Sequence, residues 1–372
     1  MKKNKRVIVA MSGGIDSSVA AALLKEQGYD VIGVFMKFWF QRHSEAGCGV
    51  KSNRCCSSES ETRARLVAKK LGISFYVFNF EKEFKKKIVD YFLKDSKLGL
   101  TPNPCVVCNK EIKFGLLFKK LNALKADYIA TGHYARLRQG KLLKAKDKNK
   151  DQSYFLWKLD QKILKKTLFP IGDYTKSEIR SLAKKFKLSF EDVPESQEIC
   201  FVQTSINDFL KKYLKTKPGL IITRQGLVIG RHQGLWFYTI GQRKGIGLAG
   251  GPAFAKASAG KPFYVLDKNI KKNLLIVTNN EKDLYKKELV VKNLNWISGK
   301  VPKFPLKAMV GIRYNHKPAS ALLIWDKLGL SQIKIKLVRP QKAVTPGQSA
   351  VFFLPTGQAG QKDELLGGGI II

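Results

Sequence analysis

The sequence predicts an α/β protein in which a doubly wound parallel sheet is followed by a small, turn-rich central domain and a C-terminal antiparallel β-barrel. Strand-like and helical runs alternate through the first half, glycines become frequent from about residue 206, and short strand-like runs recur evenly after residue 279. Alternating strands and helices favour a parallel sheet, whereas evenly spaced short strands favour a barrel. A chain of 372 residues can hold three cores, which we expect at residues 1–205, 206–278 and 279–372.

The first strand and the first helix flank a glycine-rich turn. Within residues 6–11, every residue after Arg6 is apolar and most are β-branched, as expected of a parallel strand covered on both faces. A helix is expected over residues 17–27, with apolar positions at Val19, Leu23 and Leu24. The turn between them has the sequence Met11-Ser12-Gly13-Gly14-Ile15-Asp16-Ser17-Ser18.

This turn has the composition of a phosphate-binding loop. Glycines permit a close approach of the backbone, and serine hydroxyls together with helix N-terminal amides can donate to a bound oxyanion. The lysine of the Walker pattern G-x-x-x-x-G-K-[ST] is missing, which argues against transfer of a terminal phosphate. We therefore expect the turn to bind the phosphates of ATP. The alternative is an ordinary Gly-Gly turn between a strand and a helix.

The rest of the first domain continues the alternation. Strands are expected at residues 31–36, 74–80 and 128–131, with helices at residues 61–71, 84–93 and 114–124. Ligands of such sheets bind at the carboxyl ends of the strands. Residues 12–18, Met36 and Gly132-His133 should therefore share one crevice.

Turns dominate the second domain and strands dominate the third. Glycines punctuate residues 219–251, and residues 253–261 are expected to form an exposed loop without a chemical role. The strands expected in the barrel are residues 289–296, 307–314, 320–325, 332–338 and 349–353.

The chain is strongly basic, with a formal charge of +39 and a pI near 10.0. Lysines and arginines that neutralise phosphates release counterions, so this charge favours a polyanionic partner such as a nucleic acid. Only 13 of the 68 basic residues are arginine, and a general bias toward lysine is the competing explanation. Because the sequence shows no run of eighteen apolar residues and no cleavable leader, we expect a soluble, cytoplasmic protein without membrane contact.

The six cysteines are expected to be reduced thiols, reactive or metal-bound. Cys105 and Cys108 form a C-x-x-C pair behind two prolines and ahead of a helix near Lys113, a setting that favours the thiolate. The pair alone fits half a zinc site, a redox pair or a nucleophile with a neighbour. Cys200 alone would be taken for an inert buried thiol. A glycine- and serine-rich loop, expected to be flexible rather than metal-binding, holds Cys48, Cys55 and Cys56.

Further motifs follow the glycine-rich turn along the chain. Together with the turn itself (residues 12–18), the motifs are residues 33–37, 103–114, 130–134, 151–155, 196–201, 241–245, 344–348 and 367–369. In this order they resemble the bacterial tRNA-specific 2-thiouridylases, the MnmA family of the PP-loop ATP pyrophosphatases. The resemblance covers nearly the whole chain.

The resemblance implies a tRNA-uridine 2-sulfurtransferase. ATP would adenylate the C2 oxygen of the wobble uridine of tRNA, with release of pyrophosphate, and AMP would leave when sulfur arrives. Cys200 would carry the sulfur as a persulfide received from a cysteine desulfurase or a sulfur-relay protein. Cys108 would be the nucleophile that releases it, as hydrosulfide or through a transient disulfide with Cys200.

The resemblance also implies the binding residues. ATP, accompanied by Mg²⁺, would contact Ala10, Met11, Ser12, Gly13, Gly14, Ile15, Asp16, Ser17, Met36 and Gly132. The target base would meet Asn103, Pro104 and Cys105. The rest of the anticodon stem-loop would contact His133, Asp151, Gln152, Ser153, Arg313, Tyr314 and Gln348. We expect the protein to act as a monomer.

Cys105 departs from a common pattern, because many members of the family carry an aspartate at this position. Three thiols, Cys105, Cys108 and Cys200, could therefore converge on an iron–sulfur cluster instead of acting in a persulfide relay. We favour the relay. Two rival functions are another PP-loop synthetase, for which the separated cysteines would be needless, and a non-catalytic RNA-binding protein, against which the intact turn and Cys108 argue.

Overall fold

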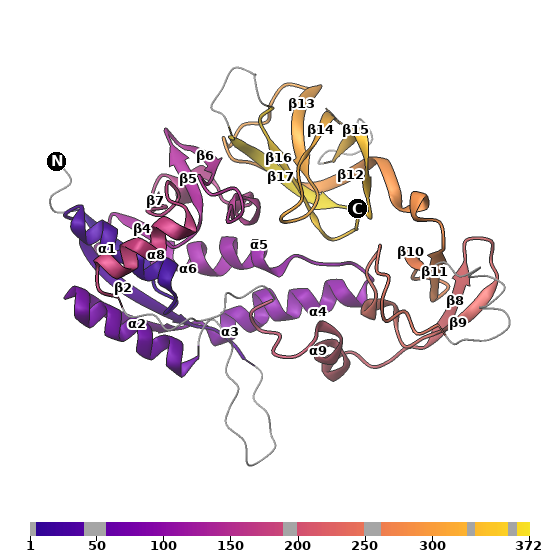
Figure 1. The fold of residues 1–372 in the computed structure, drawn as a ribbon, viewed down its shortest axis with the longest axis horizontal. Helices are drawn as coiled ribbons and strands as arrows, with labels where there is room; N and C mark the ends of the chain where they lie inside the picture. The colour runs from indigo at the N-terminus through magenta and orange to yellow at the C-terminus, as the bar shows by residue number, and fades with distance from the viewer. Residues whose placement is uncertain (1–4, 41–56, 189–198, 249–261, 326–331, 356–362) are drawn as a thin grey trace, which may run out of the picture.

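The computed structural model describes residues 5–40, 57–188, 199–248, 262–325, 332–355 and 363–372. Figure 1 shows a body of sheet and helices at the N-terminal end, a barrel above the central helices and a small sheet at the far end. The predicted fold class is confirmed, with a parallel sheet, a small middle sheet and an antiparallel barrel. No helix in the described part of the chain is long and apolar enough to span a bilayer.

The N-terminal sheet has five parallel strands in the order β3-β2-β1-β4-β7. Its strands are β1 (Arg6–Ala10), β2 (Asp30–Lys37), β3 (Ser74–Asn79), β4 (Tyr128–Thr131) and β7 (Thr167–Leu168). Strand β1 lies at the centre, where Val7, Ile8 and Val9 are fully buried, as predicted. The chain runs from β1 to one side and later returns to the other, so the crevice typical of such sheets opens at the ends of β1 and β4.

Helices cover this sheet and extend from it. They are α1 (Ile15–Glu26), α2 (Ser58–Leu71), α3 (Glu81–Phe84), α4 (Asp90–Lys97), α5 (Pro104–Cys108), α6 (Gly115–Lys120), α7 (Gln161–Leu164) and α8 (Lys176–Lys185). Two π-helical segments, Lys85–Val89 and Asn109–Phe114, interrupt the helical runs that contain α4 and α6. Wider turns of this kind are frequent at functional sites, and the second one directly follows Cys108.

The middle part combines helix α9 (Ile206–Tyr213) with a four-stranded sheet in the order β10-β11-β8-β9. Its strands are β8 (Gly219–Thr223), β9 (Val228–His232), β10 (Tyr264–Asn269) and β11 (Leu274–Thr278). The predicted loop at residues 253–261 lies outside the described residues. A hairpin within the first domain, beside β17 of the barrel, consists of β5 (Ala135–Arg138) and β6 (Lys141–Lys144).

Six antiparallel strands close the C-terminal barrel in the order β12-β15-β14-β13-β16-β17. They are β12 (Tyr285–Trp296), β13 (Leu306–Gly311), β14 (Ala319–Trp325), β15 (Ile333–Lys342), β16 (Ser349–Phe353) and β17 (Leu365–Ile371). The sequence did not predict β17, because glycines are depleted in strands and this one contains Gly367, Gly368 and Gly369. A Cβ at Gly368 would lie 2.8 Å from Cδ2 of Trp157, so the glycine lets the barrel pack on the first domain.

The barrel has an apolar core of its own, and a few of its residues, among them Val351, Phe353 and Leu365, pack into the core of the first domain. The side chain of Trp157 is fully buried at this junction, and the carboxamide of Asn295 on β12 donates to the carbonyl oxygens of Trp157 and Leu159. The hydroxyl of Tyr154 donates to the carbonyl oxygen of Ser349 over 3.0 Å. These contacts fix the barrel against the domain that carries the predicted ATP and cysteine residues.

Candidate functional site

The predicted phosphate-binding turn, which we call the nucleotide loop (residues 11–18), forms a closed hydrogen-bonded turn between β1 and α1. The hydroxyl of Ser17 donates to the carbonyl oxygen of Gly14 and accepts from the backbone amide of Ser12, over 3.0 and 3.1 Å. Gly13 has a φ of +74°, and a Cβ there would lie 2.2 Å from the carbonyl oxygen of Ser60 in α2. Only glycine fits at this position, so the backbone of the loop can pack directly against the start of α2.

Met36 and Gly132, predicted to contact ATP, lie on the two strands that flank β1. Met36 is buried near the end of β2, and Gly132 follows the last residue of β4. A Cβ on Gly132 would lie 2.7 Å from the backbone nitrogen of Ser17. The ends of β1, β2 and β4 therefore meet at one edge of the sheet, with the N-terminus of α1 pressed against Gly132.

Asp16 of the nucleotide loop is bound by two side chains from later in the chain. Lys176, the first residue of α8, places its Nζ 2.8 and 3.0 Å from the two carboxylate oxygens. The hydroxyl of Tyr134 donates to one of these oxygens over 2.8 Å. Tyr134 lies in one of the motifs recognised in the sequence (residues 130–134). Lys176 lies outside all of them, so the sequence did not indicate its contact with the loop.

The cysteine pair lies on α5, in a segment we call the cysteine loop (residues 101–108). Asn103 caps the helix, since its side-chain oxygen accepts from the backbone amide of Val106 over 3.4 Å. Cys108 is buried, whereas Cys105 is partly exposed. The π-helical segment behind Cys108 is anchored by Asn109, whose carboxamide donates to the carbonyl oxygen of Phe155.

Cys200 is partly exposed and directly precedes a buried anchor, Phe201. The ring of Phe201 contacts those of Phe84, Phe92 and Phe209, with centroids 5.4 to 5.9 Å away. No disulfide joins any two of the described cysteines. Residues 196–198 of the predicted motif, and the cysteines at positions 48, 55 and 56, lie outside the described residues.

An iron–sulfur cluster would need its three thiolates close together. Among the residues that the structure describes, no three His, Cys, Asp or Glu side chains are grouped so that they could hold a metal ion. Cys105, Cys108 and Cys200 therefore do not form a prearranged three-thiolate site, and we derive no chemical step through a cluster.

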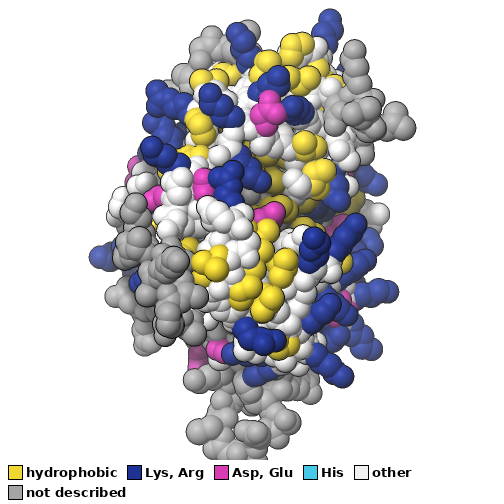
Figure 2. Space-filling view, turned by 90° about the vertical axis from the view of Figure 1, so that its right-hand side faces the viewer, with side chains coloured by type: hydrophobic (Ala, Val, Ile, Leu, Met, Phe, Trp, Pro, Cys, Tyr) yellow, Lys and Arg dark blue, Asp and Glu magenta, His cyan; other side chains and the backbone are white. Residues whose placement is uncertain are grey.

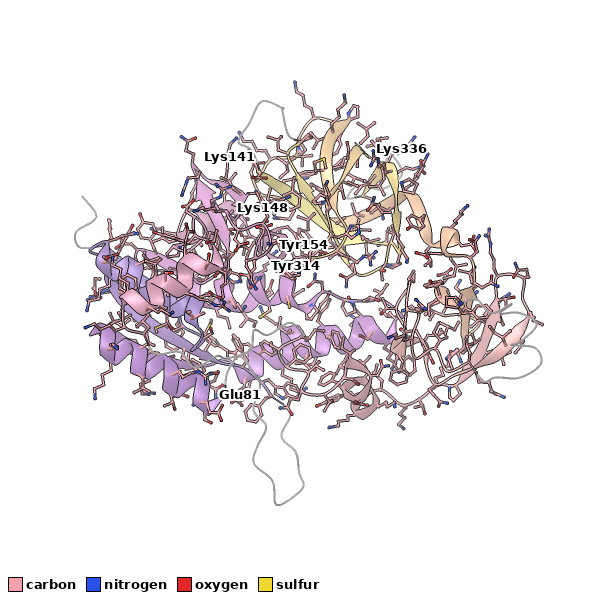
Figure 3. The ribbon with its side chains drawn as sticks, viewed as in Figure 1. Glu81, Lys141, Lys148, Tyr154, Tyr314 and Lys336 are labelled. Atoms are coloured by element: carbon pink, nitrogen blue, oxygen red, sulfur yellow. The ribbon has the colours of Figure 1, made fainter. Side chains whose placement is uncertain are left out.

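Three of the predicted tRNA residues, Asp151 of the first domain and Arg313 and Tyr314 of the barrel, line one cavity. This cavity of about 500 Å³, the junction cavity, lies between the first domain and the barrel and is lined by Lys144, Lys148, Asp151, Tyr154, Arg313, Tyr314, His316, Lys317 and Phe353, among others. The ring of Tyr314 lies 4.5 Å from that of Phe155 and 6.2 Å from that of Tyr154. Figure 3 shows Tyr154 and Tyr314 side by side, with Lys148 just beyond them.

Comparison with known proteins decides the family. Three family models match consecutive parts of the chain, described as tRNA methyl transferase HUP domain (residues 5–204), tRNA methyl transferase PRC-barrel domain (residues 207–279) and aminomethyltransferase beta-barrel domain (residues 286–371). The chain is 42% identical over its whole length to "tRNA-specific 2-thiouridylase MnmA" of Clostridioides difficile, covering 99% of that protein. It is 43% identical to the protein of the same name from Carboxydothermus hydrogenoformans, over 99% of this chain and 97% of that one. The chain belongs to the tRNA-specific 2-thiouridylase family.

A third thiouridylase of that name, from Buchnera aphidicola, is 44% identical over 100% of this chain and 98% of its own. Among solved structures, a predicted subunit of tRNA methyltransferase from Methanocaldococcus jannaschii matches 48% of this chain and 74% of its own, with 20% identity and a TM-score of 0.31. The full-length relatives confirm the family that the sequence motifs indicated.

Several residues predicted to contact tRNA in this thiouridylase have partners within the chain. The carboxylate of Asp151 accepts from the amide of Ala145 and the hydroxyl of Ser153, over 2.9 and 2.8 Å, and burial raises its pKa. The side-chain oxygen of Gln152 accepts from the amide of Tyr134 over 3.1 Å. Of these three residues, Asp151 lines the junction cavity, whereas Gln152 and Ser153 form hydrogen bonds within the chain beside it.

Gln348 and Arg313, predicted to touch tRNA from the barrel, also bind the protein itself. The carboxamide of Gln348 donates to the carbonyl oxygen of Thr101 over 2.9 Å, while the amide of Thr101 donates to the carbonyl of Pro346. The guanidinium of Arg313 donates to the carbonyl of Lys342, and its buried Nε has no hydrogen-bond partner in the described part of the chain. Gln348 therefore fastens the barrel to the cysteine loop.

His133 lies beyond the end of β4, between the rings of Phe114 and Phe169, with centroids 5.7 and 6.5 Å from its own. Its Nδ1 lies 2.7 Å from the hydroxyl of Thr131. Burial, with a smaller contribution from the charge of Lys113, holds the pKa of His133 well below its usual value. The imidazole is neutral at pH 7 and packs under the π-helical segment that follows Cys108.

Proposed function

We propose that this chain is an ATP-dependent 2-thiouridylase that acts on the wobble uridine of tRNA. The observation that supports the proposal most strongly is the match to the 2-thiouridylases over the whole chain. In addition, one domain holds both the nucleotide loop, which lacks a Walker lysine, and the helix with the C-x-x-C pair. The HUP domain implies the use of ATP. The finer steps below are inferred from the residues that this chain supplies.

The nucleotide loop would hold ATP while the uridine is activated. Backbone amides at the start of α1 and the hydroxyls of Ser12 and Ser17 are donors for the phosphates. The uridine O2 would attack the α-phosphorus, the bond to the bridging oxygen would break, and pyrophosphate would leave. AMP then remains on O2 as the group to be displaced. Mg²⁺ would accompany ATP, with Asp16 as the nearest carboxylate in the loop.

The two cysteines would deliver the sulfur. Cys108 would attack the Sγ of a Cys200 persulfide, forming the Cys108–Cys200 disulfide and releasing hydrosulfide with the bonding electron pair. Hydrosulfide would add to C2 of the uridine, lose its proton and expel AMP. Two equivalents of an external thiol would then reduce the disulfide and be joined in a disulfide of their own. The persulfide itself would come from a cysteine desulfurase or a sulfur-relay protein, and the enzyme would act as a cytoplasmic monomer.

Positive charge supports tRNA as the substrate. Figure 2 shows Lys and Arg side chains spread over the end of the molecule that holds the small middle sheet, seen from the right-hand side of Figure 1, with fewer acidic side chains among them. Contacts with phosphates would supply affinity, and an unstacked wobble base would enter toward Asn103 and Cys108.

The direct test is mass spectrometry of tRNA nucleosides after incubation with ATP and a persulfide donor. The full chain should form 2-thiouridine and release one AMP per modified base. Cys108→Ala and Cys200→Ala should each abolish the product, because either thiol is needed for hydrosulfide release. Product formation by either variant at the rate of the unmodified protein would contradict the assigned thiol chemistry.

Substitution of Cys105 distinguishes the persulfide relay from an iron–sulfur cluster mechanism. Under the relay, Cys105→Asp should keep activity, since only Cys108 and Cys200 handle sulfur. The cluster mechanism instead requires stoichiometric iron and acid-labile sulfide in anaerobically purified protein, and loss of both iron and activity in Cys105→Asp. That combination would overturn the relay.

A further inference from the structure

The acidic residue of the nucleotide loop is held in an ion pair from a distant element. Lys176 Nζ lies 2.8 and 3.0 Å from the two carboxylate oxygens of Asp16, and Tyr134 adds a hydrogen bond of 2.8 Å. The side chain of Lys176 is only 13% exposed and that of Asp16 31% exposed. The pair is therefore largely shielded from water, unlike the many surface ion pairs of this basic chain.

The backbone of Lys176 is fixed before its side chain reaches the loop. Thr175 caps α8 through the amide of Glu178, and the Glu178 carboxylate accepts from the backbone of Thr175 in return. The amide of Lys176 donates to the carboxylate of Asp147 over 3.0 Å. Helix α8 also packs against α1, whose first turn is part of the nucleotide loop. The ammonium group of Lys176 therefore contacts the loop from a backbone position that is fixed by the start of α8.

The nucleotide loop has no cation of its own, since residues 11–18 contain neither Lys nor Arg. Within the described part of the chain, the cationic side chains of Arg63 and Lys176 reach it from other elements. Arg63 donates to the carbonyl oxygen of Gly13 and to the hydroxyl of Ser60, so it supports the loop's backbone. Lys176 is bonded to a carboxylate instead, and a carboxylate can yield its partner to a phosphate of higher charge.

We infer that Lys176 is a phosphate-binding residue of this enzyme, which exchanges Asp16 for the β- and γ-phosphates when ATP enters the nucleotide loop. The inference rests on the proposed function and adds a residue to its ATP site. Cleavage at the α-phosphorus sends the bonding electron pair to pyrophosphate, and the ammonium of Lys176 neutralises that charge. The carboxylate of Asp16, released from Lys176, becomes an oxygen ligand of the kind that Mg²⁺ accepts.

The test is calorimetric binding of ATP, pyrophosphate and AMP to the full chain without tRNA or a sulfur donor. Lys176→Met keeps the length of the side chain and removes its charge. It should raise the Kd for ATP and for pyrophosphate by roughly tenfold or more, while the Kd for AMP changes less than about twofold. Lys176→Arg should recover part of the loss. The control is Lys184→Met on the exposed face of the same helix, which should bind all three ligands normally.

A second variant separates phosphate binding from mere neutralisation of Asp16. If Lys176 acts only by pairing with Asp16, the double variant Asp16→Asn/Lys176→Met should bind pyrophosphate as well as Asp16→Asn alone. That result would overturn the inference, as would an equal loss of AMP and ATP affinity in Lys176→Met. Because these measurements need no tRNA, a failure to form 2-thiouridine would count against the proposed function and leave the role of Lys176 to be decided separately.

Discussion

Two histidines, His133 and His232, are expected to make the stability of the folded chain depend on pH. His133 lies between two phenylalanine rings, and His232 is fully buried with its Nε2 3.1 Å from the carbonyl oxygen of Asn273. The buried Nδ1 of His232 has no hydrogen-bond partner in the described residues. Burial lowers the pKa of both imidazoles below the ordinary value of 6.5. Both rings are therefore held neutral by the fold.

We predict that stability is lost as the pH falls below about 6.5. The unfolded chain takes up a proton at each histidine near that pH and the folded chain does not, so the free energy of unfolding decreases by up to about 1.4 kcal/mol per pH unit and histidine. Calorimetric unfolding between pH 7.5 and 5 should show this decline, and the variant His133→Gln/His232→Gln should show less of it. Parallel curves for the two proteins would exclude the histidines as the cause.

Among individual residues, the sequence predicted those that act together with their neighbours in the chain. It missed those that reach the site from a distant part of the chain. The glycines and serines of the nucleotide loop could be recognised because strand, turn and helix follow one another within residues 6–26. Lys176 is 160 positions away from Asp16, and its local signal, the capping box of Thr175 and Glu178, indicates only a helix start. Nothing in one sequence shows which lysine reaches the loop.

At the scale of elements, the cap of α5 connects helix stability with the predicted contact to the target base. The oxygen of Asn103 accepts from the amide of Val106 at the start of a helix of five residues that carries both cysteines. Asn103→Ala should cost about 1 kcal/mol of stability, whereas Asn103→Asp keeps a good capping oxygen and should cost little. Thermal unfolding measures this difference.

Activity then separates the two roles of Asn103. If the amide also contacts the target base, Asn103→Asp should lose 2-thiouridine formation although its stability is normal. Full activity in Asn103→Asp together with a loss in Asn103→Ala would reduce the role of Asn103 to capping.

Elements with regular patterns were predictable, and elements shaped by their neighbours were not. The run Tyr128–Thr131 is a strand at the predicted residues, because a buried parallel strand is apolar throughout. Strand β17 was missed, since its glycines are required by Trp157 of another domain rather than by the strand itself. The π-helical turn after Cys108 has no sequence pattern of its own, and its anchor, Asn109, binds a carbonyl 46 residues later.

At the scale of the whole molecule, the barrel is bound to the two segments that handle the substrate. Gln348 and Pro346 hydrogen-bond to Thr101 at the start of the cysteine loop, and Ser349 accepts from Tyr154 beside the junction cavity. A tRNA that contacts the barrel therefore contacts a body continuous with the cysteine helix. The sequence indicated a basic protein with tRNA residues in two domains, but only the fold brings Asp151 and Tyr314 to one cavity.

The contribution of positive charge at the junction cavity to tRNA binding can be tested by removing one lysine. Lys317 is exposed at the rim of this cavity on the barrel side, where a tRNA phosphate would be reached without breaking a bond within the described chain. Lys317→Met should weaken tRNA binding at low salt and lower the slope of log Kd against log salt by about 0.7 to 0.9, the value of one phosphate contact.

The matched control is Lys336→Met, a lysine on the upper, outer side of the barrel, away from Lys148 and Tyr314 in Figure 3. It removes the same charge from the same barrel, so a purely long-range effect of net charge would change both slopes alike. Binding measured between 50 and 200 mM salt should leave the slope of Lys336→Met unchanged and that of Lys317→Met reduced. Equal slopes in the two variants would show that tRNA responds to the total charge of the protein and not to the junction cavity.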